Sequence, residues 1–169
     1  LCACSINEQG FYEAGTGTAK EATESAAAEK EEGIIAEYGS STDIRGCDTF
    51  TDIIDRKFAF GRGYTNAVLG GTDVLLISDS LFDIGGGLGA ATSAELYCYK
   101  DGVPVYLGYV RSGGSANPLS AKDGKLYIAG PHYVRKNTVA DGAPMTQEEA
   151  RGTFDKQGRV TYHFSSGDG

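Results

Sequence analysis

Two histidines, His132 and His163, are the side chains in this sequence suited to proton transfer near neutral pH. His132 follows Gly130-Pro131 where a turn leads into a strand, a position at which exposed functional residues often lie. A general base needs a nucleophile or a carboxylate within about 2.6–3.2 Å, and no motif supplies one. Ser78 and Ser80 lack the G-x-S-x-G pattern of a nucleophile elbow. The sequence therefore predicts no catalytic residue, with a hydrolase or lyase that uses His132 and nearby carboxylates as the alternative.

Asp79 and Asp83 form the best candidate for a metal site, together with Asp73 and the glycine loop at 85–87. Calcium takes six to eight oxygen ligands, which loops of Asp and Gly can supply. The D-x-D-x-D-G spacing of an EF-hand is absent, and carboxylates in turns commonly cap backbone N–H groups. Calcium bound by Asp79 and Asp83 is thus one interpretation, and turn capping without any metal cofactor is the favoured one.

Tyrosine is abundant in the second half of the chain and could form an aromatic binding face. Its ring offers apolar area and its hydroxyl a polar tip, a combination suited to protein or carbohydrate ligands. We select Tyr97, Tyr99, His132 and Tyr133 as candidate ligand-binding residues. The competing interpretation is that the tyrosines pack across neighbouring strands.

Cys47 and Cys98 could form a disulfide if the chain folds in an oxidising compartment. The bridge would close a loop of about 50 residues and stabilise the fold by roughly 4 kcal/mol. Two buried free thiols are the favoured interpretation, because Cys98 shares a strand face with Ala94 and Leu96, which suits the core.

These side chains must be positioned by strands, and a β-hairpin is the clearest element. The runs 94–100 and 103–110 flank Asp101-Gly102, a pair that favours the positive φ angles of a type I′ turn. Pro104 predicts that the second strand lies at a sheet edge or begins irregularly. The apolar run at 73–78 predicts a central strand.

Further strands are predicted around glycine-containing turns, at 64–69, 125–129, 132–139 and 159–164. The segment 146–154 fits a strand, with Ala150, Gly152 and Phe154 facing inward, although Thr146 and Glu149 could also begin a helical turn. The predicted fold class is mainly β, an antiparallel meander of sandwich, barrel or propeller-like form.

Charge and composition divide the chain into two parts. The net charge is −8, and residues 1–60 hold twelve acids and five bases, so the remainder is nearly neutral. Residues 1–33 contain few large apolar side chains and predict a flexible acidic tether, partly helical or disordered. Residues 34–169 are predicted to form a single β-rich domain. No basic stripe supports nucleic-acid binding.

The first five residues, Leu1-Cys2-Ala3-Cys4-Ser5, resemble the end of a bacterial lipoprotein signal, with Leu three residues before Cys4 and a small residue just before it. The resemblance implies a lipid on Cys4 as the only membrane attachment. It also implies an extracytoplasmic location, either anchored at the cell surface or secreted.

The stretch 72–164 resembles domains of uncharacterised secreted or lipid-anchored proteins of Gram-positive gut bacteria. The resemblance is carried by GTDVLLISDS (71–80), AELYCYKDG (94–102), VYLGYVRSGG (105–114) and KDGKLYIAGPHYVRK (122–136). Many members have an Asp-x-Asp-Gly-Asp-Gly segment, of which only Asp79, Asp83 and the glycines are present here. The resemblance implies fold and location rather than an activity. With no catalytic motif, we expect a non-enzymatic module that binds a protein, peptide or glycan.

Overall fold

The computed structural model describes residues 12–13, 41–58 and 62–167. Its helical elements are η1 (Ser41–Ile44) and α1 (Phe50–Lys57). Its strands are β1 (Tyr12–Glu13), β2 (Gly63–Leu69), β3 (Thr72–Ser78), β4 (Leu81–Asp83), β5 (Gly89–Ala91), β6 (Ser93–Lys100), β7 (Val103–Arg111), β8 (Ser120–Lys122), β9 (Lys125–Gly130), β10 (Tyr133–Ala140), β11 (Ala143–Phe154) and β12 (Val160–Ser166).

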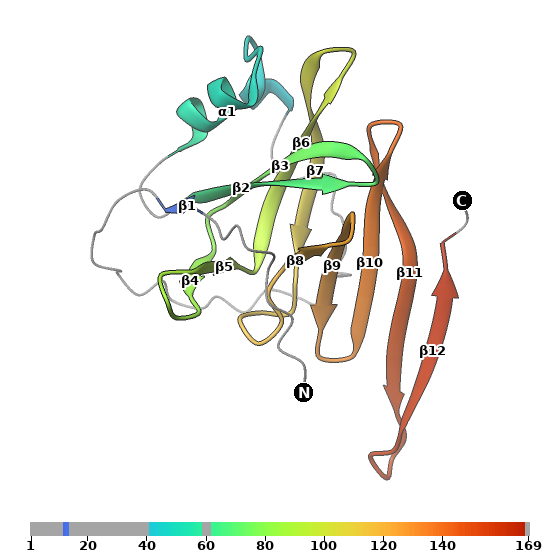
Figure 1. The fold of residues 1–169 in the computed structure, drawn as a ribbon. Coiled ribbons are helices and arrows are strands. Elements are labelled where there is room, and N and C mark those ends of the chain that lie inside the picture. Colours follow the sequence, from blue (N-terminus) through green and yellow to red (C-terminus); the bar gives the residue numbers. More distant parts are fainter. Residues whose placement is uncertain (1–11, 14–40, 59–61, 168–169) are drawn as a thin grey trace.

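The described strands form two five-stranded sheets and a small two-stranded one (Figure 1). The first sheet has the order β1-β2-β3-β6-β7, the second has the order β12-β11-β10-β9-β8, and β4 pairs with β5. Every pairing is antiparallel. The predicted class, mainly β with an antiparallel meander, is confirmed.

The main core lies between the two large sheets. The first sheet contributes Val74, Leu76, Leu96 and Cys98, among others, and the second contributes Leu126, Ile128 and Val139. Burial of such side chains stabilises the fold by roughly 25 cal/mol per Å² of apolar area removed from water. The packing of these two sheets fixes which face of each remains open to ligands.

The opposite face of the first sheet is covered by α1. The helix begins with a capping box in which Thr49 and Asp52 bond each other's backbone N–H groups. Its fully buried Ile53 joins Leu75, Ile77 and other residues in a second core cluster. The alternate residues of β3 thus enter two different cores, which explains its continuous apolar run and confirms it as a central strand.

The predicted hairpin is confirmed, and Asp101 and Gly102 adopt φ angles of 52° and 78°. Pro104 lies in β7, an edge strand of the first sheet, as predicted. The Gly70-Gly71 turn between β2 and β3 also has positive φ angles, 60° and 83°. At Gly70 this turn meets the backbone of β10 so closely that a Cβ there would overlap the Val139 carbonyl oxygen.

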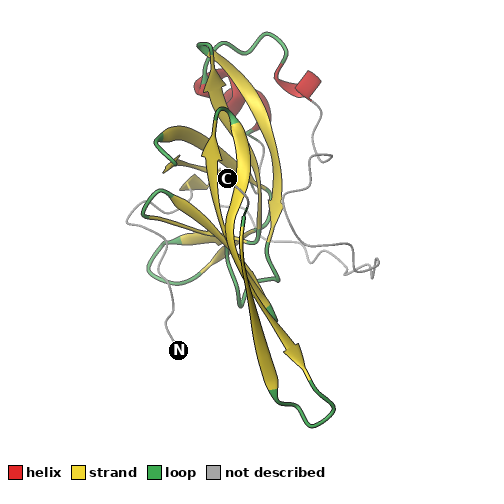
Figure 2. Ribbon diagram, turned by 90° about the vertical axis from the view of Figure 1, so that its right-hand side faces the viewer, coloured by secondary structure: helices red, strands yellow, loops and turns green. Residues whose placement is uncertain are grey.

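The second sheet extends beyond the first through the long hairpin of β11 and β12, which projects from the body of the molecule (Figure 2). Segment 146–154 is a strand, but the expectation that Ala150 and Phe154 face inward is wrong. Ala150 is paired with Val134 and Phe164, opposite to the face that carries the core residues Leu126 and Ile128. Gly152, on the same outward face, is buried only because Val160, Tyr162 and His132 crowd it.

Cys47 and Cys98 are buried free thiols, as favoured from the sequence. They belong to core clusters on opposite faces of the first sheet, so the sheet itself separates them.

Cys4 and most of the predicted tether at 1–33 lie outside the described residues. The exception is β1 (Tyr12–Glu13), which pairs with β2. Within the described ranges, no helix has the length and apolar character needed to cross a membrane.

Candidate binding surface

The face of the second sheet that points away from the core carries an exposed apolar surface. We call it the outer face and define it by Val134, Phe154, Val160, Tyr162 and Phe164. Strand pairing places these residues on one side, because Phe154 is opposite Val160 and Ala150 is opposite both Val134 and Phe164. Phe164 is 81% exposed, Tyr162 62% and Phe154 57%. Isolated exposed apolar residues are ordinary, but a contiguous set is not.

A shallow groove of about 550 Å³ runs across the outer face. Val134, Ala150 and Phe164 line its apolar part. Lys136 and Glu148, whose ammonium and carboxylate lie 3.1 Å apart, form a polar border. The groove thus joins an apolar floor to a charged rim, as protein-binding surfaces often do.

On the opposite, inner face of the second sheet, charged side chains of β10 and β11 hold the strands in position. Glu149 on β11 accepts hydrogen bonds from Arg135 on β10, at 2.6 Å, and from Arg151, at 2.9 Å. Both guanidinium groups lie over the Tyr133 ring. Burial alone would raise the pKa of Glu149, but the two arginines outweigh it and hold that pKa below its ordinary value. The ion pairs therefore fix the strands that present the outer face.

The structure does not bring the four predicted ligand-binding residues together. Tyr97 is 1% exposed within the core under α1. The Tyr99 hydroxyl accepts a hydrogen bond from the Phe50 backbone N–H at 2.9 Å, and the two rings stack. Tyr133 packs against the main core, on the inner face of the second sheet.

His132 is the one of the four that borders the outer face. It is exposed and its ring makes an edge contact with Phe154, with centroids 4.9 Å apart. Its backbone carbonyl accepts a hydrogen bond from Gly152 at 2.6 Å. Tyr97 and Tyr99 instead hold α1 on the first sheet.

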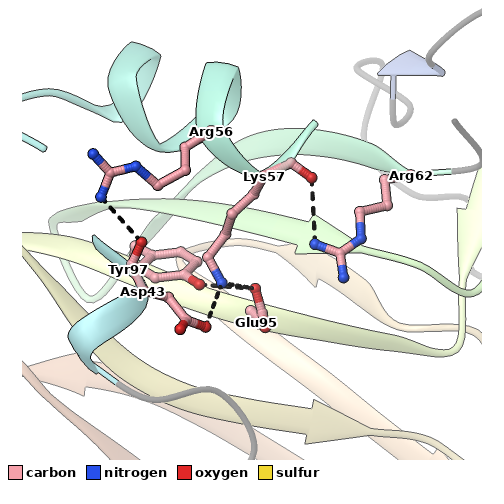
Figure 3. Close-up of polar contacts among 6 residues, drawn as sticks. All are labelled: Asp43, Arg56, Lys57, Arg62, Glu95 and Tyr97. Carbon is pink, nitrogen blue, oxygen red and sulfur yellow. Dashed lines mark hydrogen bonds and ion pairs between the residues drawn. The ribbon is translucent and has the colours of Figure 1, made fainter. Parts of the chain in front are cut away.

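A half-buried cluster of charged and hydroxyl groups lies beneath α1 (Figure 3). The Lys57 ammonium lies 2.9 Å from the Glu95 carboxylate and 3.3 Å from that of Asp43. Tyr97 donates its hydroxyl hydrogen to Glu95 at 2.8 Å. Arg56 donates to the backbone carbonyls of Asp43 and Arg45, which attaches the helix to η1.

The charges of this cluster satisfy one another and attach α1 to the first sheet. The Lys57 side chain is only 8% exposed, so it has little access to a ligand. Burial raises the pKa of Tyr97 far above its ordinary value, and Glu95 raises it further. Burial also raises the pKa of Tyr106 to about 12. Both phenols stay protonated at physiological pH and act as packing and hydrogen-bonding groups.

The two candidate metal ligands, Asp79 and Asp83, differ in their surroundings. The Asp83 carboxylate accepts a hydrogen bond from the Gly85 N–H at 2.6 Å, which is the turn-capping arrangement considered above. Asp79 is exposed in the short segment between β3 and β4. Within the described ranges, no group of three or more His, Cys, Asp or Glu side chains is placed to hold a metal ion.

Among the described residues, the His132 ring has no hydrogen-bonded nucleophile or carboxylate, and the His163 ring contacts only an exposed threonine hydroxyl. His163 Nε2 lies 3.2 Å from the Thr153 hydroxyl on the exposed hairpin. His132 contacts an aromatic ring, and neither imidazole bonds a carboxylate among the described residues. The hydrolase alternative therefore has no geometric support around His132.

The outer face was not predicted from the sequence, although the sequence contains a signal for it. Val160, Tyr162 and Phe164 alternate with polar residues, and Phe154 precedes them across a turn. The alternation predicts a strand at 159–164, but it does not show that the apolar side of the strand stays exposed. Comparisons of the chain with protein-family models, with curated proteins and with solved structures found no match.

Proposed function

We propose that this chain is a non-enzymatic binding module that recognises another protein or peptide through the outer face of β10–β12. The observation that carries the proposal is the contiguous exposed apolar set on that face. An aromatic side chain has roughly 150–250 Å² of surface, so the exposed fractions of Phe154, Tyr162 and Phe164 together amount to about 400 Å². Exposed patches of this size are commonly interaction sites.

The chemistry of the face favours a protein or peptide over a glycan. Glycan binding needs polar groups that are free to bond hydroxyls. The charged groups that line the groove, Lys136, Glu148 and Glu149, are already held in ion pairs. The apolar floor of the groove suits an aliphatic or aromatic anchor side chain of a partner.

We propose that the module works outside the cytoplasm, attached to a membrane by a lipid on Cys4 or secreted. The support is the resemblance of Leu1 to Ser5 to a lipoprotein signal end and the acidic composition of the segment that follows. Mass spectrometry of the native protein tests this part, because diacylation of Cys4 adds a defined mass. An unmodified Cys4 in membrane-extracted protein would reject the anchor.

The binding proposal is tested by panning a displayed random-peptide library against the intact protein. We expect apolar peptides to be enriched, and we expect the double substitution Tyr162→Ser and Phe164→Ser to weaken their binding at least about tenfold. His163→Ser is the matched control, because it lies on the same strand but on the other face. Peptides that bind the double variant as tightly as the wild type would refute the outer face as the site.

Sedimentation with insoluble chitin, cellulose and peptidoglycan examines the glycan alternative. We expect the protein to stay in the supernatant. Retention that depends on Tyr162 and Phe164 would assign the face to a glycan instead.

A further inference from the structure

Strand β12 is the end strand of the second sheet, and one of its edges has no partner strand among the described residues (Figure 1). The side to which each backbone N–H and C=O group of β12 points can be inferred from the hydrogen bonds of β11. Gly152 donates its N–H to His132, toward β10, whereas the Gln147 carbonyl accepts from Gly167, toward β12. Because backbone groups alternate along a strand, odd-numbered residues of this part of β11 point toward β12.

The same alternation assigns the open edge of β12. The residues opposite the odd-numbered positions of β11 are Thr161, His163 and Ser165, and their N–H and C=O groups are used within the hairpin. The N–H and C=O groups of Val160, Tyr162 and Phe164 therefore point outward. The residues whose side chains form the outer face thus also offer the unpaired backbone groups.

This edge lacks the features that usually prevent strand pairing. Natural edge strands are protected by charged side chains, proline, bulges or short length. Residues 160–166 contain no Lys, Arg, Asp, Glu or Pro. The β11–β12 register runs without a shift over seven residue pairs.

We propose that β12 pairs antiparallel with β12 of a second copy of this chain, with Tyr162 of each copy at the two-fold axis. In this register Val160 is opposite Phe164 of the other copy. The three outward-pointing residues of each copy then form about six backbone hydrogen bonds. The two second sheets become one continuous sheet, and their apolar outer faces join side by side.

The sequence of β12 makes a second copy a fitting occupant. The apolar residues Val160, Tyr162 and Phe164 are distributed symmetrically about position 162, so antiparallel self-pairing places apolar against apolar. Charge repulsion at the paired strands does not oppose this dimer, although the net charge of the chain is −8, because β12 itself carries no formal charge. The nearest cation, Arg159, would lie opposite Ser165 of the other copy.

The size of the interface predicts a weak, reversible dimer. Interfaces carry about one hydrogen bond per 100–200 Å², so about six bonds correspond to roughly 600–1,200 Å² in total. This is the range of transient complexes. The inference goes beyond the proposed function, because pairing at the edge leaves the outer face open and gives the dimer two adjacent binding faces.

Sedimentation velocity of the full chain from about 1 to about 300 µM tests the dimer. We expect reversible self-association that Tyr162→Lys weakens at least about tenfold, because it places two like charges opposite each other at the axis. Phe154→Lys is the matched control, since it removes an aromatic from the same face but away from the edge. A monomer at all concentrations, or a dimer lost in Phe154→Lys and kept in Tyr162→Lys, would overturn the proposal.

Cysteine cross-linking tests the register without relying on that variant. Val160→Cys and Phe164→Cys are made separately in a Cys2→Ser, Cys4→Ser background. The two positions would lie about 5.5 Å apart across the axis, within the disulfide range, whereas identical positions would lie about 14 Å apart. We expect oxidation to cross-link the mixture and neither protein alone. Cross-linking of either variant with itself, or none in the mixture, would refute the register.

Discussion

The Gly70-Gly71 turn allows the cost of backbone conformation and the cost of a steric clash to be measured separately. Both residues have positive φ, so alanine at either position costs about 1 kcal/mol from the left-handed conformation alone. A Cβ at Gly71 meets nothing within 4 Å, but one at Gly70 would overlap the Val139 carbonyl and the Thr138 hydroxyl. Displacing packed backbone typically adds about 1–3 kcal/mol.

We therefore expect Gly71→Ala to lower the free energy of unfolding by about 1 kcal/mol and Gly70→Ala to lower it by about 3 kcal/mol. Urea unfolding followed by circular dichroism and by tyrosine fluorescence measures both values, and coincident transitions establish two-state behaviour. Equal losses for the two variants would refute the close contact between this turn and β10, and with it the packing of the two sheets at this corner.

Three further substitutions test polar interactions within the fold. Ser80→Ala should destabilise the protein by about 2 kcal/mol in urea, because the Ser80 hydroxyl accepts from two backbone N–H groups, whereas exposed Ser165→Ala should change little. Glu149 has a lowered pKa, so it stabilises the fold above its unfolded value near 4.5, and that contribution is lost as the pH falls through the lower folded value. Melting curves of Glu149→Gln should accordingly show lower stability at neutral pH and a shallower loss below about pH 4.5, and an unchanged acid slope would contradict the Arg135–Glu149–Arg151 network. Lys57→Met should lower the melting temperature, because it leaves the half-buried Glu95 carboxylate without its cation. Adding Glu95→Gln to this variant should restore part of the lost stability. A double variant that melts no higher than Lys57→Met would contradict the role of this ion pair.

Local sequence signals were sufficient for the long strands of this fold and for several of its turns, but the short strands β4, β5 and β8 were not predicted. Asp101-Gly102 determines its turn because its backbone conformation is intrinsic to the residues. The run at 73–78 identified a central strand because it lacks any polar face. Both signals lie within a few residues and need no knowledge of distant contacts.

The orientation of β11 and the location of the surface could not be obtained in this way. Ala150 and Phe154 were expected inside because apolar residues usually face a core. Their direction instead depends on the register between β10 and β11, and the inner side is taken by Arg135, Glu149 and Arg151. The contact of Lys57 with Glu95 spans 38 residues and likewise depends on how α1 lies on the sheet.

Every side chain of β12 is exposed, and this has a consequence for how the protein can change over generations. Substitutions at solvent-facing positions usually alter stability by less than about 0.5 kcal/mol. New specificities can therefore be sampled along this strand while the rest of the molecule continues to fold as before. A family of such modules could share one architecture and differ in the targets it recognises.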